Sequence, residues 1–346
     1  HETAANWFTL AAKQGYVNAQ CNLGVMYHNG QGVAHNDKTA VKWFTLAAEQ
    51  GHAQAQTNLG FLYAGDVAVA EDDQTAAQWF ILAAEQGNVD AQSNLGHMYL
   101  KGDGVPQSYQ AAAEYFTKAA EQGHFEAQYK LGVAYSEGYG VLSNNKTAAL
   151  WYTLAAEQGH ARAQYDLGHL YQGKKGVPKN YEAVVKWYTK AAEQGNTHAQ
   201  NGLGAIYSRG EGMTQSFELA VYWYTKAAEQ GDAASQYDLG KMHSGEAGIP
   251  QNDKLALYWY TKAAEQGHVS AQYNLGTMHS MGAGIPKNLK MAVYWYIKAA
   301  EQNHVSAQAN LGLAYETGAG TPKNQQAALK WYTQSAEQGH VIAQCQ

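Results

Sequence analysis

Apolar residues follow a helical spacing along the whole chain. In the segment 51–86, Ala55, Leu59 and Leu62 are separated by four and three residues, and Tyr63 follows directly. This spacing places the side chains on one face of a helix. We therefore expect a helix over 53–63, with this face turned towards the core.

A second helical pattern follows each first one after a short turn. In the preceding repeat its apolar face, again with steps of three and four residues, consists of Ala40, Trp43, Phe44, Ala47 and Ala48. The turn ends on residue types that commonly cap helix N-termini, namely Asn36, Asp72, Ser108, Asn144, Asn180, Ser216, Asn252, Asn288 and Asn324. All nine tryptophans share one position of this second helix, where only Tyr115 replaces them, and we expect these rings in the core.

The two-helix pattern returns every 36 residues. A residue that tolerates positive φ ends each second helix, and these residues are Gly15, Gly51, Gly87, Gly123, Gly159, Gly195, Gly231, Gly267, Asn303 and Gly339. A fixed period of this length is typical of a solenoid, in which each repeat contacts only its neighbours. We predict one array over 1–346, with a half repeat at 1–14, nine full repeats at 15–338 and a truncated repeat at 339–346.

A glycine also lies inside the first helix of each complete repeat, directly after a leucine, as in Leu59-Gly60. A mid-helix glycine costs about 1 kcal/mol relative to alanine. Its regular return implies that a neighbouring helix passes too close at this point for a side chain.

Charge and composition narrow the range of functions. The net charge is −6, with no dominant basic face for nucleic acid, and no apolar run approaches the ~20 residues of a membrane span. Six histidines share one turn position in different repeats, so we expect them to lie too far apart to bind one metal ion. The Gly-x-Gly turns follow a helix and lack a third glycine, unlike phosphate-binding loops. We predict no cofactor, no metal site and no catalytic residue, and we interpret the chain as non-enzymatic.

One recurring string is specific enough to suggest a family. Ala-Gln-x-x-Leu-Gly-x-x-Tyr, then Gly-x-Gly-Val, then Ala-x-x-Trp-Tyr-x-x-Ala-Ala-Glu-Gln-Gly resembles the Sel-one-like repeat family, a relative of the tetratricopeptide repeats. Ala68 departs from the second turn glycine, and His243 and His279 replace the usual tyrosine. The resemblance implies an all-α, right-handed αα superhelical solenoid that acts as a protein-interaction scaffold. For bacterial members it also implies contact with host and envelope proteins, and hence a periplasmic or extracellular location.

Positions at which the repeats differ are candidates for partner binding. If the first helices line a concave side, the face opposite their core positions forms a groove for protein or peptide, and its aromatic residues are Phe61, Tyr129, Tyr165, Tyr237 and Tyr273. Asparagine is unfavourable in the middle of a helix, yet the same helices contain Asn22, Asn58, Asn94, Asn274 and Asn310. These amides could bond either to the backbone of a bound peptide or to the neighbouring repeat.

The solvent face of the second helix is another candidate surface. It contains rows of apolar and aromatic residues, which suit a contact surface, and which include Leu46, Leu82, Tyr222, Tyr258 and Tyr294. The alternative is that these side chains flank the core and shield it.

The two cysteines suggest a further mode of assembly. Cys21 and Cys345 share one repeat position nine repeats apart, and we expect both on helix surfaces. A disulfide needs Cα atoms within about 7 Å, so the alternative is an intermolecular link between chain ends. End-to-end assembly into a filament is therefore one alternative function, and a secreted bacterial host-interaction factor is another. Asn145 begins the one N-glycosylation sequon.

Overall fold

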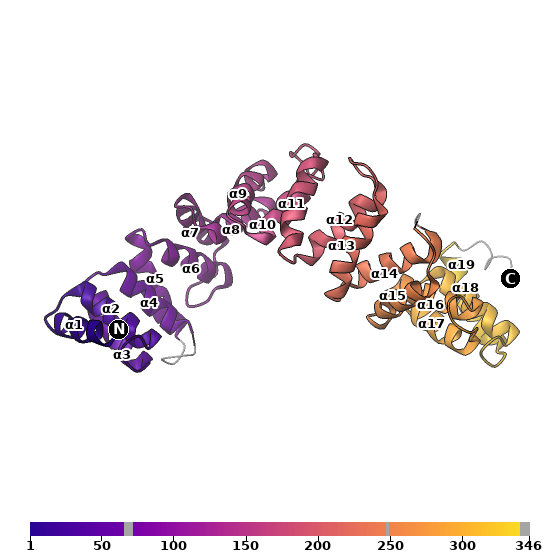
Figure 1. The fold of residues 1–346 in the computed structure, drawn as a ribbon, viewed down its shortest axis with the longest axis horizontal. Helices are drawn as coiled ribbons and strands as arrows, with labels where there is room; N and C mark the ends of the chain where they lie inside the picture. The colour runs from indigo at the N-terminus through magenta and orange to yellow at the C-terminus, as the bar shows by residue number, and fades with distance from the viewer. Residues whose placement is uncertain (66–71, 247–248, 340–346) are drawn as a thin grey trace. The chain divides into compact units, whose positions relative to one another are not determined.

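The computed structural model describes residues 1–65, 72–246 and 249–339, which consist of helices and turns without a strand. The chain forms two compact units, His1–Asn180 and Tyr181–Gln346. The helices of the first unit are α1 Glu2–Lys13, α2 Val17–Asn29, α3 Asp37–Glu49, α4 Ala53–Tyr63, α5 Asp73–Glu85, α6 Val89–Lys101, α7 Tyr109–Glu121, α8 Phe125–Glu137, α9 Asn145–Glu157 and α10 Ala161–Leu170 (Figure 1).

The second unit continues the same succession of helices. Its elements are α11 Tyr181–Glu193, α12 Thr197–Arg209, α13 Phe217–Glu229, α14 Ala233–Lys241, the short π-helix η1 Met242–Glu246, α15 Asp253–Glu265, α16 Val269–Met281, α17 Leu289–Glu301, α18 Val305–Thr317 and α19 Gln325–Glu337 (Figure 1). The predicted all-α solenoid of 36-residue repeats is confirmed. The single continuous array over 1–346 stays a prediction, and Ala68 lies outside the described residues.

Each repeat consists of two helices, here called the A-helix and the B-helix. The A-helices are the even-numbered helices α2 to α18, and the B-helices are the odd-numbered helices α3 to α19. Within each unit an A-helix packs on the B-helix that follows it and on the B-helix before it. The buried apolar residues of both helices fill the space between them, as Ala55 and Leu59 of α4 and Ala47 of α3 show.

The predicted helix ends are confirmed where the structure shows their bonds. The Asn36 side chain accepts from the backbone N–H of Thr39 at the start of α3, and Ser108 and Asn324 do the same for α7 and α19. After the B-helices, the predicted glycines have φ near +90°, and Asn303 adopts φ 65° at the same position. These bonds satisfy amide groups that a helix end would otherwise leave without a partner.

The glycine inside eight of the A-helices, α2, α4, α6, α8, α12, α14, α16 and α18, makes room for an aromatic ring. A Cβ atom on Gly132 would lie 2.5 Å from Cδ1 of Tyr152, and one on Gly24 would lie 2.6 Å from Cδ1 of Phe44. The predicted close approach is therefore confirmed. The group that approaches is the ring of the B-helix in the same repeat.

This ring follows the tryptophan by one residue. The expectation that the tryptophans lie in the core holds for Trp187 and Trp223, which are buried, and is corrected for the others. Phe44 and Tyr260 are almost fully buried, whereas Trp43 and Trp79 are only partly buried and Trp7 is 68% exposed. A step of one residue turns a helix by about 100°, so the two aromatic side chains point in different directions. Trp79 packs against a core cluster that contains Phe44 of the preceding repeat and Leu59 of its own.

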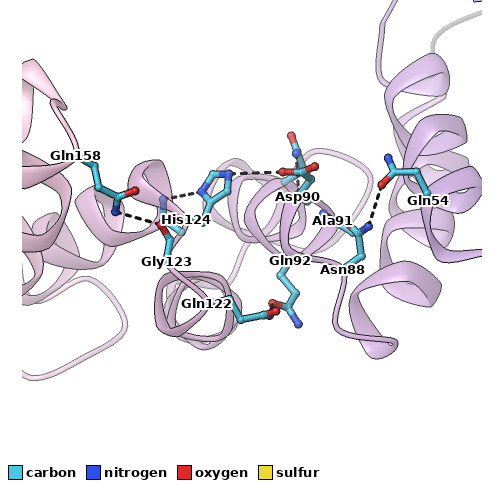
Figure 2. A network of polar contacts seen from close by, with 11 residues as sticks. Gln54, Asn88, Asp90, Ala91, Gln92, Gln122, Gly123, His124 and Gln158 are labelled. Atoms are coloured by element: carbon cyan, nitrogen blue, oxygen red, sulfur yellow. Dashed lines mark hydrogen bonds and ion pairs between the residues drawn. The ribbon is translucent and has the colours of Figure 1, made fainter. Parts of the chain in front are cut away.

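The constant glutamines form a second connection between repeats. Gln92 donates its side-chain amide to the backbone oxygen of Ala84 at 3.1 Å and accepts from Nε2 of Gln122 at 2.8 Å (Figure 2). The same pair of glutamines, 30 residues apart, occurs at Gln20–Gln50, Gln56–Gln86, Gln128–Gln158, Gln200–Gln230, Gln236–Gln266, Gln272–Gln302 and Gln308–Gln338. One buried amide therefore binds the preceding and the following B-helix.

Candidate interaction surfaces

Clefts open between successive A-helices, and the B-helix between them forms the floor. One cleft, between α2 and α4, has a volume of about 430 Å³ and is lined by Val25, Phe61 and, on the floor, Phe44. A cleft of about 470 Å³ lies between α8 and α10, with Tyr152 on its floor. The cleft between α16 and α18 has the same volume of about 470 Å³. A smaller cleft of about 160 Å³ lies between α6 and α8.

Several of the predicted groove residues line these clefts. Phe61 and Asn58 face the cleft between α2 and α4, where the Phe61 ring is 46% exposed. Tyr129 lines the clefts on both sides of α8. Tyr273 and Asn310 line the cleft between α16 and α18 from opposite walls.

The other predicted groove residues lie in different surroundings. Asn94 donates to the backbone oxygen of Asp90 in its own helix at 2.8 Å, which is a structural role. Asn22 is exposed, whereas Asn274, Tyr165 and Tyr237 are half-buried. The role of the groove residues as a partner site stays a prediction.

The predicted tyrosines of the A-helices also connect consecutive repeats. The Tyr129 ring stacks on His160 with 4.4 Å between the ring centroids. Tyr237 stacks on His268 and Tyr273 on His304 in the same way, at 4.5 and 4.6 Å. These tyrosines therefore have one face against the next repeat.

The histidines in these stacks cap the A-helices, a role that the sequence analysis did not identify. Nδ1 of His160 accepts from the backbone N–H of Ala163 at 3.0 Å, and Nε2 lies 3.0 Å from Oε2 of Glu126. Since Nδ1 accepts, the ring proton is on Nε2 and is donated to the Glu126 carboxylate. The same N-cap position is held by Asn88, Asn196 and Asp232 in other repeats, and this substitution pattern was the available signal.

The cleft between α8 and α10 contains the most polar lining. It includes Asp166, Glu137, His169 and Lys174 beside the rings of Tyr129 and Tyr152. Burial raises the pKa of Asp166 above its ordinary value, while hydrogen bonding with Tyr129 and the nearby His169 act in the opposite direction. Burial also raises the pKa of the Tyr129 and Tyr152 hydroxyl groups, so both stay protonated at neutral pH.

The B-helix surface is exposed where the sequence analysis placed it. Tyr222, Tyr258 and Tyr294 are between 47% and 51% exposed. Each of these rings packs edge-on against the tryptophan that follows it, with centroid distances of 4.8 to 4.9 Å. Leu46 and Leu82 are exposed to a similar extent. Since the tyrosines contact the tryptophans, shielding of the core accounts for part of this pattern.

Cys21 lies inside the protein, which corrects the expected surface position. Its side chain is 4% exposed and packs in the core cluster with Phe44 and Leu59. Burial raises the pKa of the Cys21 thiol to about 11. Cys345 lies outside the described residues. At the sequon, the Asn145 side chain donates to the backbone oxygen of Lys175 at 3.0 Å.

No group of three or more histidine, cysteine, aspartate or glutamate residues in the described part of the chain is arranged to hold a metal ion. None of the helices described here has the length and apolar character needed to cross a membrane.

The repeated helix pair, with its glycine and its aromatic ring, agrees with a known family. The Sel1 repeat matches residues 1–16, 17–52, 53–88, 89–124, 125–160, 161–196, 197–232, 233–268, 269–304 and 305–340. The chain belongs to the Sel1 repeat family. Each complete match starts at the first residue of an A-helix, two residues after the glycine that the sequence analysis used to count repeats.

Solved structures of Sel1 repeat proteins are similar over most of the chain. One is c5321, a protective antigen from uropathogenic Escherichia coli strains, with 40% identity, a TM-score of 0.90, and coverage of 98% of this chain and 73% of that one. Another is a Sel1 repeat protein from Oxalobacter formigenes, with 32% identity, a TM-score of 0.70, and coverage of 87% of each chain. No match was found among curated proteins. Sel1 repeat proteins generally serve as protein-interaction scaffolds.

Proposed function

We propose that this chain is a non-enzymatic scaffold that binds an extended peptide segment of a partner protein along its A-helices. The observation that carries the proposal is the repetition of the clefts. The same opening between two A-helices, with an aromatic ring on its floor, occurs in both units. A series of similar clefts suits an extended chain, which can place a side chain in each of them.

The chemistry of the cleft walls supports a peptide as the occupant. Phe61 and Leu313 offer exposed apolar surface, while Asn58 and Asn310 on the same walls offer amides that can donate to and accept from a peptide backbone. Apolar walls with a few polar groups are the usual composition of ligand clefts. The tyrosines that stack on histidines contribute rigid walls.

Selection from a library of random short peptides tests this function. The chain should enrich a set of peptides, and Phe61→Ala should weaken the binding of those that use the cleft between α2 and α4 by about tenfold. Leu82→Ala is the matched control, because Leu82 is 44% exposed on a B-helix of the same unit. If no peptide is enriched, or if both variants weaken binding equally, the groove is not the binding site.

End-to-end assembly through Cys21 and Cys345 stays a prediction. A buried thiol with a raised pKa is a poor nucleophile for disulfide exchange, so the environment of Cys21 does not favour an intermolecular link. The periplasmic or extracellular location and a role in contact with a host also stay predictions.

A further inference from the structure

The cleft between α8 and α10 differs in chemistry from the other clefts. Two carboxylates, Glu137 and Asp166, lie in its lining together with Lys174. The cleft between α2 and α4 instead has Val25, Phe61 and Leu62 at its walls, and none of the described residues that line it is a carboxylate. Two clefts that repeat the same backbone geometry thus present different side chains to an occupant.

Comparison of the repeats shows that a carboxylate is not needed for the fold at this position. The residue equivalent to Asp166 is an asparagine in five other repeats, Asn22, Asn58, Asn94, Asn274 and Asn310. Asparagine has nearly the same shape and carries no charge to desolvate. Burial of the Asp166 carboxylate opposes its ionised form, so the charge costs stability that asparagine would not cost.

The groups around Asp166 offset the desolvation cost of its carboxylate only in part. The hydrogen bond with Tyr129 favours the carboxylate most, and His169, the capping His160 and Arg162 act in the same direction. Lys174 is also part of the cleft lining, and Glu137 at the end of α8 adds a second negative charge. From α9, Asn145 and Tyr152 contribute neutral groups. Even with these groups, burial keeps the pKa of Asp166 above its ordinary value, so an additional cation in the cleft would stabilise the carboxylate.

The aromatic walls select among cations. Tyr129 and Tyr152 both line the cleft, but Tyr152 is 3% exposed and one face of Tyr129 stacks on His160. The other side of the Tyr129 ring is the aromatic surface left for an occupant, and a tyrosine face attracts a cation. A guanidinium group is planar and weakly hydrated, so it can stack on a ring and pair with a carboxylate at the same time. An ammonium group forms the ion pair without the stacking.

We propose that the cleft between α8 and α10 binds an arginine side chain of the peptide, with Asp166 as the carboxylate that recognises the guanidinium group. This inference rests on the proposed function, because it identifies which side chain one of the clefts accepts. Glu137 assists at the mouth of the cleft, where it is exposed. Asp166 thus contributes to recognition at a cost in stability.

The peptide selection can test this inference separately from the proposed function. The unmodified chain should enrich peptides with an arginine at one fixed position, and Asp166→Asn should remove that enrichment. Replacement of this arginine by citrulline, which is neutral and similar in shape, should weaken binding to the unmodified chain about tenfold or more. Binding to Asp166→Asn should be nearly indifferent to the same replacement.

Asp238→Asn provides the matched control. Asp238 holds the same repeat position on α14, and burial raises its pKa as it does for Asp166, but Asp238 is not in the lining of the cleft between α8 and α10. This variant should keep the arginine enrichment. Asp166→Asn should melt at the same or a higher temperature than the unmodified chain at pH 7, which shows that a loss of binding is not unfolding.

The outcomes are distinct. Peptides enriched without arginine, equal enrichment of lysine, or an Asp166→Asn variant that selects the same peptides would each overturn this inference and leave the peptide scaffold standing. A selection that enriches no peptide at all would count against both proposals.

Discussion

Nε2 of Gln122 donates to Oε1 of Gln92 at 2.8 Å, and Gln92 in turn donates to the backbone oxygen of Ala84 (Figure 2). These two bonds join α5, α6 and α7 through one buried side chain. A buried amide that lost its partners would carry a desolvation cost. The regular return of these glutamines therefore follows from the geometry of stacking, since each repeat needs the same connection to its neighbours.

Removal of this buried amide should destabilise the protein substantially. In Gln92→Ala the backbone oxygen of Ala84 and Nε2 of Gln122 each lose one of their hydrogen bonds, and the missing side chain leaves a cavity. We expect a loss of about 2 kcal/mol in the free energy of unfolding. Chemical denaturation followed by circular dichroism measures it. Gln122→Ala is the control, because this side chain is exposed and water can replace it. If Gln92→Ala and Gln122→Ala lost the same free energy of unfolding, burial of the Gln92 amide would not be the cause of the loss.

Addition of a methyl group inside an A-helix should also destabilise the fold. Gly132→Ala places a Cβ atom 2.5 Å from the Tyr152 ring, and overpacking of this kind costs about 1–3 kcal/mol. Alanine is otherwise the better helix former, so a purely local helix would gain stability. In a chain that already carries Tyr152→Leu, Gly132→Ala should cost less stability than it costs in the unmodified chain. Equal costs in the two backgrounds would contradict a direct clash.

The capping histidines should make stability depend on pH. Burial lowers the pKa of His268 and His304 from the ordinary value of 6.5, so the unfolded chain takes up protons before the folded chain does. Their contribution is complete above pH 6.5 and is lost as the pH falls through the lowered pKa values of the folded state. Protonation also removes the Nδ1 lone pair that accepts from the helix backbone.

Thermal melts across this pH range measure the effect, and the chain itself suggests the control. His268→Asn keeps an N-cap acceptor, as Asn88 and Asn196 do in other repeats, but does not titrate. We expect this variant to lose less stability than the unmodified chain between pH 7 and pH 5. A variant with the same pH dependence would show that His268 is not one of the groups responsible.

Two histidines at another repeat position should be replaceable with a gain in stability. Nδ1 of His243 and Nδ1 of His279 are buried without a hydrogen-bond partner, and burial lowers both pKa values. Most other repeats have a tyrosine here, such as Tyr99 and Tyr135. His279→Tyr should therefore raise the melting temperature, most clearly below pH 6.5. A decrease would show that the surrounding repeat is built for the smaller ring.

Much of the candidate site could be anticipated from the sequence, because one turn of a helix determines which residues share a face. Phe61, Tyr129 and Tyr273 were placed on the outer face of their helices by spacing alone, and all three line clefts. The clefts themselves could not be predicted. Their volume depends on how far apart two A-helices lie, which the intervening B-helix decides.

The sequence by itself determined the repeat length, the helix pairs and the capping residues after the turns, since these follow from local backbone chemistry and a fixed period. The period also marked positions such as Gly132 as requiring glycine, but the reason, the Tyr152 ring, came from the tertiary structure. Only the tertiary structure decided that Tyr152 is buried more deeply than Trp151, that Cys21 is in the core, and that His160 caps one helix while it stacks on Tyr129 of the preceding repeat. These relationships join residues of different helices. Spacing within a single repeat contains no information about them, because they depend on how one repeat packs against the next.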